Sequence, residues 1–534
     1  MTENTFDVVV IGAGPVGENV ADGAVKGGLS VAVVESELVG GECSYWACMP
    51  TKALLRDAAA LRAVRHLPGA NAAVTGELDP AAVLARRDAF AAHWHDDGQV
   101  AWLDSAGIEL VRGVGRISAP RTVEVTGADR STTVLTARHA VVVATGSSAR
   151  IPRVPGLADA APWTSREAAS AQAVPGRLAV IGGGVVGAEM ATAYAALGSQ
   201  VTMIARDGLL PTVESFASDL VAETLKAHGV TLHLRTEPES VRRDEAGTVH
   251  VRLVDGTTFD ADEVLVATGR TPNTAAVGLE HVGLTPDDWL RVDESLRVLG
   301  SDGTPIGDGW LYAAGDVNHR VLLTHQGKYQ ARALGETLVA RSGGEPVDLE
   351  PWGRHAATAD DRAVPQVIFT DPEIASVGHT AASAAAAGLR VRAVEYDLGA
   401  VAGASSTPTG TPAARAWSWT RTARCWSASP SSAPTSPSCS TPRRSPSPRR
   451  CRSTGCGTPS RPTPRSARSG SGCWRPTAGP HRAHGRPHRR RPHRAAGGRS
   501  HRSSSCCSRS RSPAWSPFRS CPMASSVCST FSSG

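Results

Sequence analysis

The sequence predicts an α/β protein with two doubly wound, Rossmann-like nucleotide-binding domains, followed by a truncated α+β domain and a disordered tail. Two observations predict the sheets: a strand, a Gly-x-Gly-x-x-Gly turn, a helix and a second strand follow one another near residue 12 and again near residue 182. A third observation separates the tail, because the composition changes abruptly near residue 404.

The composition divides the chain of 534 residues into a body and a tail. From residue 399 onward there is no Asp, Glu, Lys, Leu, Ile, Tyr, Asn or Gln, while 23 Arg and nine of the 11 Cys lie there. Residues 1–398 hold 33 Lys and Arg against 50 Asp and Glu, a net charge of −17, although the whole chain carries +6. The body is therefore acidic and long enough for two or three domains with sizeable cores.

The body shows neither a charged and then apolar leader nor an apolar run of about 18 residues. We therefore expect a cytoplasmic protein with no membrane partner. The cytosol is reducing, and the body holds only the cysteines Cys43 and Cys48. Two lone cysteines in that compartment are more often catalytic than structural.

The first unit begins with Asp7–Ile11, an apolar run typical of a buried parallel strand. Gly12, Gly14 and Gly17 follow at once, and then a helix and a second strand that ends in Glu35. The glycines permit a tight turn and the approach of a pyrophosphate to the helix N-terminus, and the acid suits a ribose hydroxyl. This context predicts a dinucleotide site.

The second unit repeats the pattern after the strand at 178–181, so the sequence predicts a second bound dinucleotide. Its glycines are Gly182, Gly184 and Gly187. Here the second strand is followed by Ala205 and Arg206, where an acid would bind a free 2′-hydroxyl. An arginine suits a 2′-phosphate, so we expect NADPH to be preferred, with NADH as the alternative.

Three further turns of small residues follow strands. They are Ala144-Thr145-Gly146, the segment Thr268-Gly269-Arg270, and Ala314-Gly315-Asp316. Taken alone, each is also compatible with a plain strand-to-turn junction, because small residues and glycine punctuate any α/β fold.

Cys43 and Cys48 lie in the segment from Gly40 to Lys52 and are five positions apart. If the segment opens a helix, the two sulfurs come within disulfide reach only when the first turn is distorted. A helix N-terminus also favours the thiolate that does redox chemistry. The spacing fits none of the common zinc patterns, and two unpaired structural thiols remain the alternative to a redox pair.

Together these motifs resemble the flavoprotein disulfide reductases, the class I pyridine nucleotide-disulfide oxidoreductases that include dihydrolipoamide dehydrogenase, glutathione reductase and mercuric reductase. The resemblance runs from about residue 5 to 404 and rests on both glycine turns, the Cys-x4-Cys-x-Pro-x-Lys segment, two Ala-Thr-Gly motifs and Ala-Gly-Asp, in the family's order. It implies an enzyme with FAD on the first unit and NAD(P)H on the second.

The resemblance also implies residue roles. Cys48 would be the thiol against the flavin and Cys43 the one that exchanges with substrate, while Lys52 would pair with Glu189 beside the flavin's reactive nitrogen. Asp316 would approach the flavin's ribityl chain, and the remaining cofactor-binding positions would include Thr145, Gly146, Gly269 and Arg270. A solvent-exposed helix lysine and a first-turn acid are the alternatives for Lys52 and Glu189.

The resemblance implies five segments: an FAD-binding domain over 1–153 and 275–345, an NAD(P)-binding domain over 154–274, a truncated dimerisation domain over 346–404 and a tail over 405–534. The acceptor would be a small-molecule disulfide, a metal ion such as Hg(II), or a quinone. The chain departs from the family at Tyr45, Trp46 and Ala47, between the cysteines. These aromatics suit simple packing at least as well as a role in substrate choice.

The tail permits two interpretations. Its arginines are compatible with a disordered arm that binds nucleic acid. Alternatively, the tail is translated out of frame from about residue 405. The genetic code permits codons for residues 454–470 that, when read one base earlier, encode a segment like the family's closing His-Pro-Thr-x-x-Glu. In the same way, permitted codons for Ala416–Ser432 encode an apolar hairpin with an acidic turn.

We favour the second interpretation and expect no nucleic-acid partner. The segment Val364–Gly378 resembles the start of the family's dimerisation domain. The tail lacks the rest of that domain and its closing histidine, so the family's homodimer is in doubt here. A segment without Leu, Ile or Tyr has little to bury, which predicts disorder from about residue 405. An inactive flavoprotein, or one with a nucleic-acid-binding tail, is the alternative class.

Overall fold

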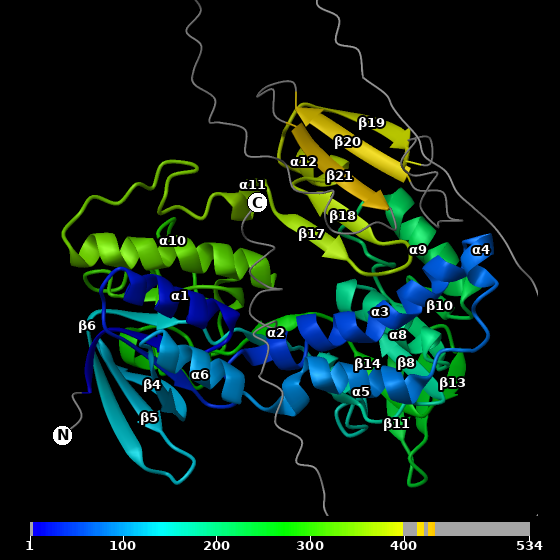
Figure 1. Ribbon diagram of the computed structural model, residues 1–534, viewed down its shortest axis with the longest axis horizontal. Coiled ribbons are helices and arrows are strands. Elements are labelled where there is room, and N and C mark those ends of the chain that lie inside the picture. The colour runs from blue at the N-terminus through cyan, green and yellow to red at the C-terminus, as the bar shows by residue number, and fades with distance from the viewer. Residues whose placement is uncertain (1–3, 399–413, 421–425, 433–534) are drawn as a thin grey trace, which may run out of the picture. The chain divides into compact units, whose positions relative to one another are not determined.

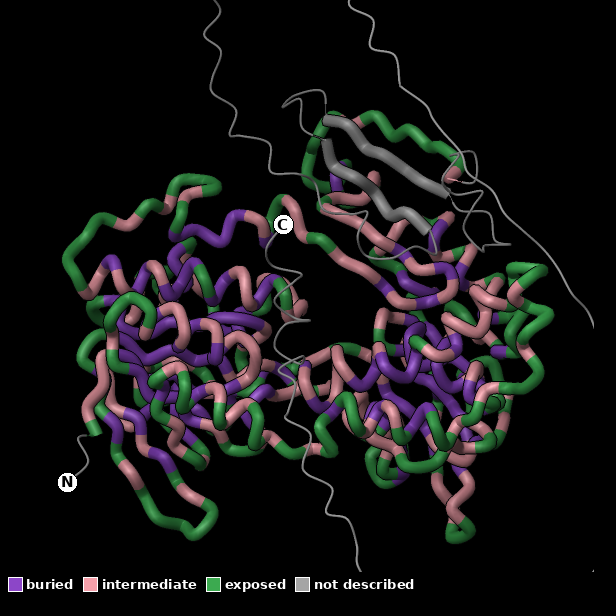
Figure 2. Tube along the Cα trace, in the orientation of Figure 1, coloured by how far each residue is buried: buried purple, intermediate pink, exposed green. Residues whose placement is uncertain are grey.

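The computed structural model describes residues 4–398, 414–420 and 426–432 (Figure 1). They belong to one compact unit, Met1–Cys439. Burial is concentrated in the strands of two parallel sheets and in the helices against them (Figure 2). The predicted α/β class and both Rossmann-like sheets are confirmed.

The first sheet has the strand order β3-β2-β1-β6-β5-β4, with β16 pairing β6. Strands β3, β2, β1, β6 and β16 run parallel, whereas β4, β5 and β6 form an antiparallel meander. The strands are β1 (Thr5–Ile11), β2 (Val31–Glu35), β3 (Glu109–Arg112), β4 (Val114–Ala119), β5 (Thr122–Thr126), β6 (Thr132–Val143) and β16 (Leu311–Ala313). The last strand comes from a segment far along the chain, after the second sheet.

Strand β1 is buried on both faces, as its continuous apolar sequence predicts. Val8 and Val10 belong to one core cluster, and Val9 and Ile11 to another. The first cluster also includes side chains of α1 (Pro15–Lys26) and α10 (Thr324–Ser342), helices that lie against each other (Figure 1). Gly23 and Gly335 meet at this crossing, where an added Cβ on Gly335 would lie 3.1 Å from the Gly23 Cα.

The second sheet has the order β10-β9-β8-β14, with all pairs parallel. A small antiparallel sheet, β11-β12-β13, shares a hydrophobic cluster with it. The strands are β8 (Arg177–Ile181), β9 (Gln200–Ala205), β10 (Thr231–Leu234), β11 (Pro238–Arg243), β12 (Val249–Leu253), β13 (Thr258–Ala261) and β14 (Glu263–Val266). Its helices are α8 (Val185–Ala196) and α9 (Ser215–Ala227), and β7 (Ser147–Ala149) pairs β15 (Arg270–Pro272) where the chain enters and leaves this region.

The segment between β2 and β3 carries the two cysteines on α2 (Gly41–Tyr45) and α3 (Cys48–Arg65). The remaining helices are α4 (Pro68–Asn71), α5 (Pro80–Phe90), η1 (Ala92–Trp94), α6 (Asp97–Ser105), α7 (Ser165–Ser170), η2 (Leu279–Val282), η3 (Asp316–Asn318), α11 (Ala359–Arg362) and α12 (Ala381–Ala386). Arg87 on α5 is fully buried and donates to the carbonyls of Ala169 (2.6 Å) and Ala171 (2.7 Å) beside α7. None of the helices in the described residues is long and apolar enough to cross a membrane.

A third sheet has the order β17-β18-β21-β20-β19 and is antiparallel. Its strands are β17 (Pro365–Ile368), β18 (Ile374–Val377), β19 (Val391–Asp397), β20 (Ala414–Thr420) and β21 (Trp426–Ser432).

Strands β20 and β21 correct the expectation of disorder from about residue 405 over 414–420 and 426–432, because both lie inside the predicted tail. An antiparallel ladder needs only main-chain donors and acceptors, which the edges of β18 and β19 supply, so the lack of Leu and Ile does not prevent it. The proposed closing segment near residue 470, and the rest of the tail from 433 to 534, lie outside the described residues.

Candidate active site

In the first glycine turn, between β1 and α1, each of the three glycines has a different steric environment. Gly12 has φ +105°, and an added Cβ would lie 2.5 Å from the carbonyl oxygen of Ala144. A Cβ on Gly17 would lie 1.9 Å from the carbonyl oxygen of Gly12, so the helix packs directly on the turn. A Cβ on Gly14 would meet nothing within 4 Å. The open side of Gly14 is the side from which a pyrophosphate could approach the backbone.

The second glycine turn, between β8 and α8, repeats this geometry. Gly182 has φ +123° and approaches the carbonyl oxygen of Ala267, which an added Cβ would meet at 2.2 Å. A Cβ on Gly187 would lie 2.0 Å from the Gly182 carbonyl oxygen, and Gly184 again has open space. The two turns therefore fit two dinucleotides in the same way.

Glu35, at the end of β2, points back to the first turn. Its Oε2 accepts from the Ala13 N–H at 2.8 Å, and its Oε1 accepts from the Glu37 N–H at 2.8 Å. Burial raises the pKa of this carboxyl, and these two hydrogen bonds oppose the rise. The carboxylate thus lies beside Gly12 and Gly14, where the fold places an acid for a ribose hydroxyl.

A polar cluster joins three of the predicted small-residue turns. Ser147 donates to Asp316 Oδ2 at 2.6 Å, and the Arg270 guanidinium donates to the Ser147 hydroxyl, also at 2.6 Å, and to its carbonyl oxygen. Arg270 Nε lies 3.7 Å from Asp316 Oδ2. The Thr145 hydroxyl is buried without a hydrogen-bond partner in the described residues, which leaves it available to a bound group. Gly146 (φ +72°) and Gly269 (φ +121°) form the adjoining turns.

The helix that carries the cysteines is broken between them, as a close approach of the two sulfurs requires. Helix α2 ends at Tyr45, Ala47 has φ −133° and ψ −97°, and α3 begins at Cys48. Cys43 is 5% exposed, and Cys48 is half-buried. The Cys48 Sγ lies 3.4 Å from the Thr324 Oγ1 at the start of α10, a contact between residues 276 positions apart that the sequence did not suggest.

Lys52 and Glu189 meet across the two parallel-sheet regions. The Lys52 Nζ lies 2.7 Å from Glu189 Oε2, while Glu189 Oε1 accepts from the Phe369 N–H at 3.0 Å. The Lys52 ammonium also lies 4.7 Å from the centre of the Phe369 ring. The Glu189 side chain is 4% exposed and that of Lys52 38%, so the carboxylate is the buried partner.

A second acid, Glu373, interacts electrostatically with Glu189 and was not identified from the sequence. Burial raises its pKa to about 7, with Arg56 and Arg62 opposing the shift and Asp371 and Glu189 adding to it. Arg62 and Asp371 form an ion pair of 2.8 Å between α3 and the β17–β18 turn. A carboxyl whose pKa is raised close to neutral and that interacts with Glu189 is a candidate for proton exchange.

The aromatic residues between the cysteines are held by the protein. Tyr45 is 2% exposed and donates to the Val39 carbonyl oxygen at 3.0 Å, which supports packing as its role. Trp46 lies beneath Arg166, whose guanidinium carbon is 4.1 Å from its ring centre. Arg166 also binds Glu42 and both carboxylate oxygens of Glu37. Helix α7 thereby holds α2, which carries Cys43.

Arg206 follows β9 and is exposed, with its guanidinium on the carboxylate of Asp207 at 2.9 and 3.2 Å. The loop of these residues touches the second glycine turn, because a Cβ on Gly183 would lie 2.3 Å from the Gly208 carbonyl oxygen. A second arginine, Arg235, lies at the same end of the sheet, where its main-chain N–H donates to the Ala205 carbonyl oxygen at 2.7 Å. The sequence indicated neither Asp207 nor Arg235.

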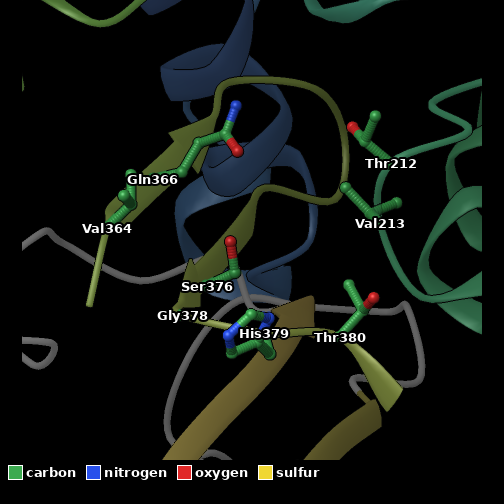
Figure 3. A pocket seen from close by; sticks show the side chains of 8 residues that line it. All are labelled: Thr212, Val213, Val364, Gln366, Ser376, Gly378, His379 and Thr380. Carbon is green, nitrogen blue, oxygen red and sulfur yellow. The ribbon is translucent and has the colours of Figure 1, made fainter. Parts of the chain in front are cut away.

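In the described residues there is no second site built from metal ligands, and a small cavity is lined by residues other than the predicted site residues. The His, Cys, Asp and Glu side chains of the described residues form no group suited to hold a metal ion. A small cavity lies between the loop before α9 and the β17–β18 hairpin, lined by residues that include Thr212, Gln366 and His379 (Figure 3). None of the predicted site residues lines it.

Comparison with known proteins gives two family matches. Residues 6–331 match the pyridine nucleotide-disulphide oxidoreductase family, and residues 364–413 match its dimerisation domain. The second match extends beyond residue 404, where the sequence resemblance was expected to end.

Three similar proteins place the match in context. Dihydrolipoyl dehydrogenase from Haloferax volcanii is 34% identical over 397 residues, covering 72% of this chain and 77% of the relative. Mercuric reductase from Staphylococcus aureus is 29% identical, covering 75% of this chain and 69% of the relative. The crystal structure of LpdA from Mycobacterium tuberculosis has a TM-score of 0.66 and 28% identity, covering 80% of this chain and 90% of that one.

Proposed function

Because this chain belongs to the pyridine nucleotide-disulphide oxidoreductase family of flavoprotein enzymes, which use FAD and a pyridine nucleotide, we propose that it passes electrons from NAD(P)H to a Cys43–Cys48 pair and on to a small acceptor. The observation that carries the proposal is that the segment with the cysteines meets both Glu189, through Lys52, and the first glycine turn, where the Gly40 N–H donates to the Ala13 carbonyl oxygen at 2.7 Å.

FAD would be held by the first turn and by residues from several elements. Gly14 leaves space for the pyrophosphate, Glu35 would bind a ribose hydroxyl, and Asp316 would approach the ribityl chain. Thr145, Gly146, Gly269 and Arg270 would line the same cofactor site. When bound, FAD supplies the chemistry that accepts hydride from a nicotinamide and delivers electrons to a disulfide.

The cysteines would act in sequence. In the reduced pair, the Cys43 thiolate attacks an oxidised sulfur of the acceptor, and a mixed disulfide forms as the acceptor's second sulfur leaves with a proton. Cys48 then attacks Cys43 Sγ, which restores the internal disulfide and releases the second thiol. The Thr324 contact joins Cys48 to the start of α10, where a Cβ on Gly327 would lie 3.3 Å from the Gly315 Cα next to Asp316. This proximity to the proposed flavin site supports Cys48 as the inner thiol.

Lys52 and Glu189 would orient the reacting groups. The buried carboxylate of Glu189 holds the Lys52 ammonium and the Phe369 main chain, which fixes a positive charge on α3, the helix that begins at Cys48. A fixed cation favours negative charge that develops near it during electron transfer.

The second turn would hold the pyridine nucleotide through Gly182, Gly184 and Gly187. Arg206 supports NADPH as the preferred coenzyme, but Asp207 offsets part of its charge, so NADH would remain a usable substrate. The main chain of Arg235 also lies at this edge, and its guanidinium would add to the preference for a 2′-phosphate.

The acceptor would be a small molecule. Cys43 is only 5% exposed, so a small disulfide, a metal ion or a quinone would reach it or the flavin more easily than a protein disulfide. The dihydrolipoyl dehydrogenase and mercuric reductase relatives favour the first two.

The domain limits from the sequence would be 1–153 and 275–345 for FAD, 154–274 for NAD(P)H and 346–404 for dimerisation. In this proposal the tail from about 405 is out of frame, and the in-frame protein is a homodimer. Restoring the frame by a single-base edit near codon 405 should then give a shorter, dimeric product by light scattering. A dimeric, fully active protein of 534 residues would contradict the frame proposal.

The proposed function is tested by anaerobic reduction of the purified protein with NADPH while its flavin absorbance is followed. We expect bound FAD and its rapid bleaching. The Cys43→Ser variant should keep this bleaching but lose turnover with a small disulfide. A wild-type protein without FAD, or a variant that turns over the disulfide normally, would contradict the proposal.

A further inference from the structure

A buried network of amides and a carboxylate lies between α10 and α11. Gln326 Nε2 donates to Asp360 Oδ1 at 2.9 Å, and Gln330 Nε2 donates to Asp360 Oδ2 at 2.8 Å. Their exposed fractions are 4%, 0% and 6% for Gln326, Gln330 and Asp360. Both carboxylate oxygens accept, so the carboxylate fixes which way each amide faces.

The fixed orientation of the Gln330 amide lets its oxygen accept hydrogen bonds from the turn that includes Asp316. With its Nε2 held by Asp360, its Oε1 accepts from the Gly315 N–H and from Asn318 Nδ2, both at 2.8 Å. These two donors lie on either side of Asp316 in the chain. Gln326 makes the same contact with Asp360, but no hydrogen bond joins it to this turn in the described residues.

The turn needs support because its backbone is crowded and buried. Gly315 has φ +82°, and an added Cβ would lie 2.9 Å from Val16 Cγ2. Its N–H would be buried without a partner if the Gln330 amide turned over, and such a loss costs about 1–3 kcal/mol. A displaced turn would move the Asp316 carboxylate, which reaches Ser147 at 2.6 Å.

We propose that Gln330 and Asp360 are positioning residues for FAD binding, acting through the Gly315–Asn318 turn on Asp316. This rests on the proposed function, in which Asp316 approaches the ribityl chain. Asp360 precedes β17 by five residues, so the network also links the entrance of the third sheet to the cofactor site.

Release of FAD from the full-length holoprotein, measured by the recovery of flavin fluorescence on dilution, tests this proposal. Gln330→Ala removes both hydrogen bonds that the turn makes to Gln330, and Asp360→Ala lets the Gln330 amide turn over. Each variant should raise the dissociation constant for FAD about tenfold, on the scale of one buried hydrogen bond. Gln326→Ala is the matched control, because it removes an equally buried bond to the same carboxylate on the same helix. It should change the constant less than about twofold.

Asp360→Asn adds a second criterion. With its side-chain oxygen in the place of Asp360 Oδ2, the asparagine can still accept from Gln330 Nε2, while its amide, in the place of Oδ1, donates to a reoriented Gln326. FAD affinity should therefore return to within about twofold of wild type. Equal weakening by Gln326→Ala and Gln330→Ala, no weakening by either, or failure of Asp360→Asn to rescue would overturn the proposal. A wild-type protein that binds no FAD would instead contradict the proposed function.

Discussion

The Lys52–Glu189 pair predicts an unequal response to removing either partner. Glu189 is 4% exposed and Lys52 38%. Lys52→Met therefore leaves a buried carboxylate whose one remaining hydrogen bond among the described residues is that from the Phe369 N–H, whereas Glu189→Gln leaves an ammonium that water can reach. The two single variants therefore measure separately the cost of an unpaired buried carboxylate and the cost of an unpaired ammonium that water can reach.

The burial of each partner sets the magnitudes. Removing one partner of a fully buried pair costs about 3–5 kcal/mol, and the partial exposure of Lys52 reduces this, so we expect Lys52→Met to lower the free energy of unfolding by about 2–3 kcal/mol. Glu189→Gln keeps the shape and should cost about 1 kcal/mol. The double variant should be more stable than Lys52→Met alone, because no unpaired buried charge remains.

Urea unfolding of all four proteins, followed by circular dichroism at pH 7, measures these differences. The matched surface control is Lys26→Met, which removes an exposed ion pair with Asp22 and should cost less than about 1 kcal/mol. If Glu189→Gln cost as much as Lys52→Met, or if the double variant were the least stable, the argument from burial would be refuted.

Three further predictions test other parts of the site. Gly14→Ala should fold normally yet weaken FAD binding, whereas Gly17→Ala should lower the melting temperature, because only a Cβ on Gly17 would meet backbone, at 1.9 Å. Equal melting temperatures of the two variants would contradict this. Arg206→Glu should shift the ratio of kcat/KM toward NADH and Asp207→Asn should shift it toward NADPH; unchanged ratios would remove the coenzyme argument. Burial raises the pKa of Glu373 to about 7, so ionisation of this carboxyl increasingly destabilises the folded state as pH rises toward 7. Glu373→Gln should therefore be more stable than wild type by about 1–2 kcal/mol at pH 8 but not at pH 5, as thermal unfolding at both pH values would show.

The sequence predicted the parallel sheets and glycine turns because their physical causes are local. Gly12 and Gly182 follow apolar strands directly, and their φ angles of +105° and +123° are those that only glycine adopts readily. The break between the cysteines was also predictable, since five positions of regular helix separate the two sulfurs.

The contacts that complete the site could not be predicted, because they join distant parts of the chain through the tertiary fold. Glu189 was expected to meet Lys52, but its bond to the Phe369 main chain depends on how the β17 segment packs. Thr324 beside Cys48 and Arg166 above Trp46 likewise have no periodic or motif signal. The pairing of β20 and β21 was missed because composition measures side-chain burial and is silent on main-chain pairing.

The most direct test of the central claim is an anaerobic reductive titration that counts electrons per bound FAD. A redox-active Cys43–Cys48 pair predicts that the wild-type protein takes up about two electrons beyond those needed by FAD, and that Cys43→Ser and Cys48→Ser each lose this extra uptake. A wild-type protein that consumes no more electrons than either cysteine variant would contradict the account.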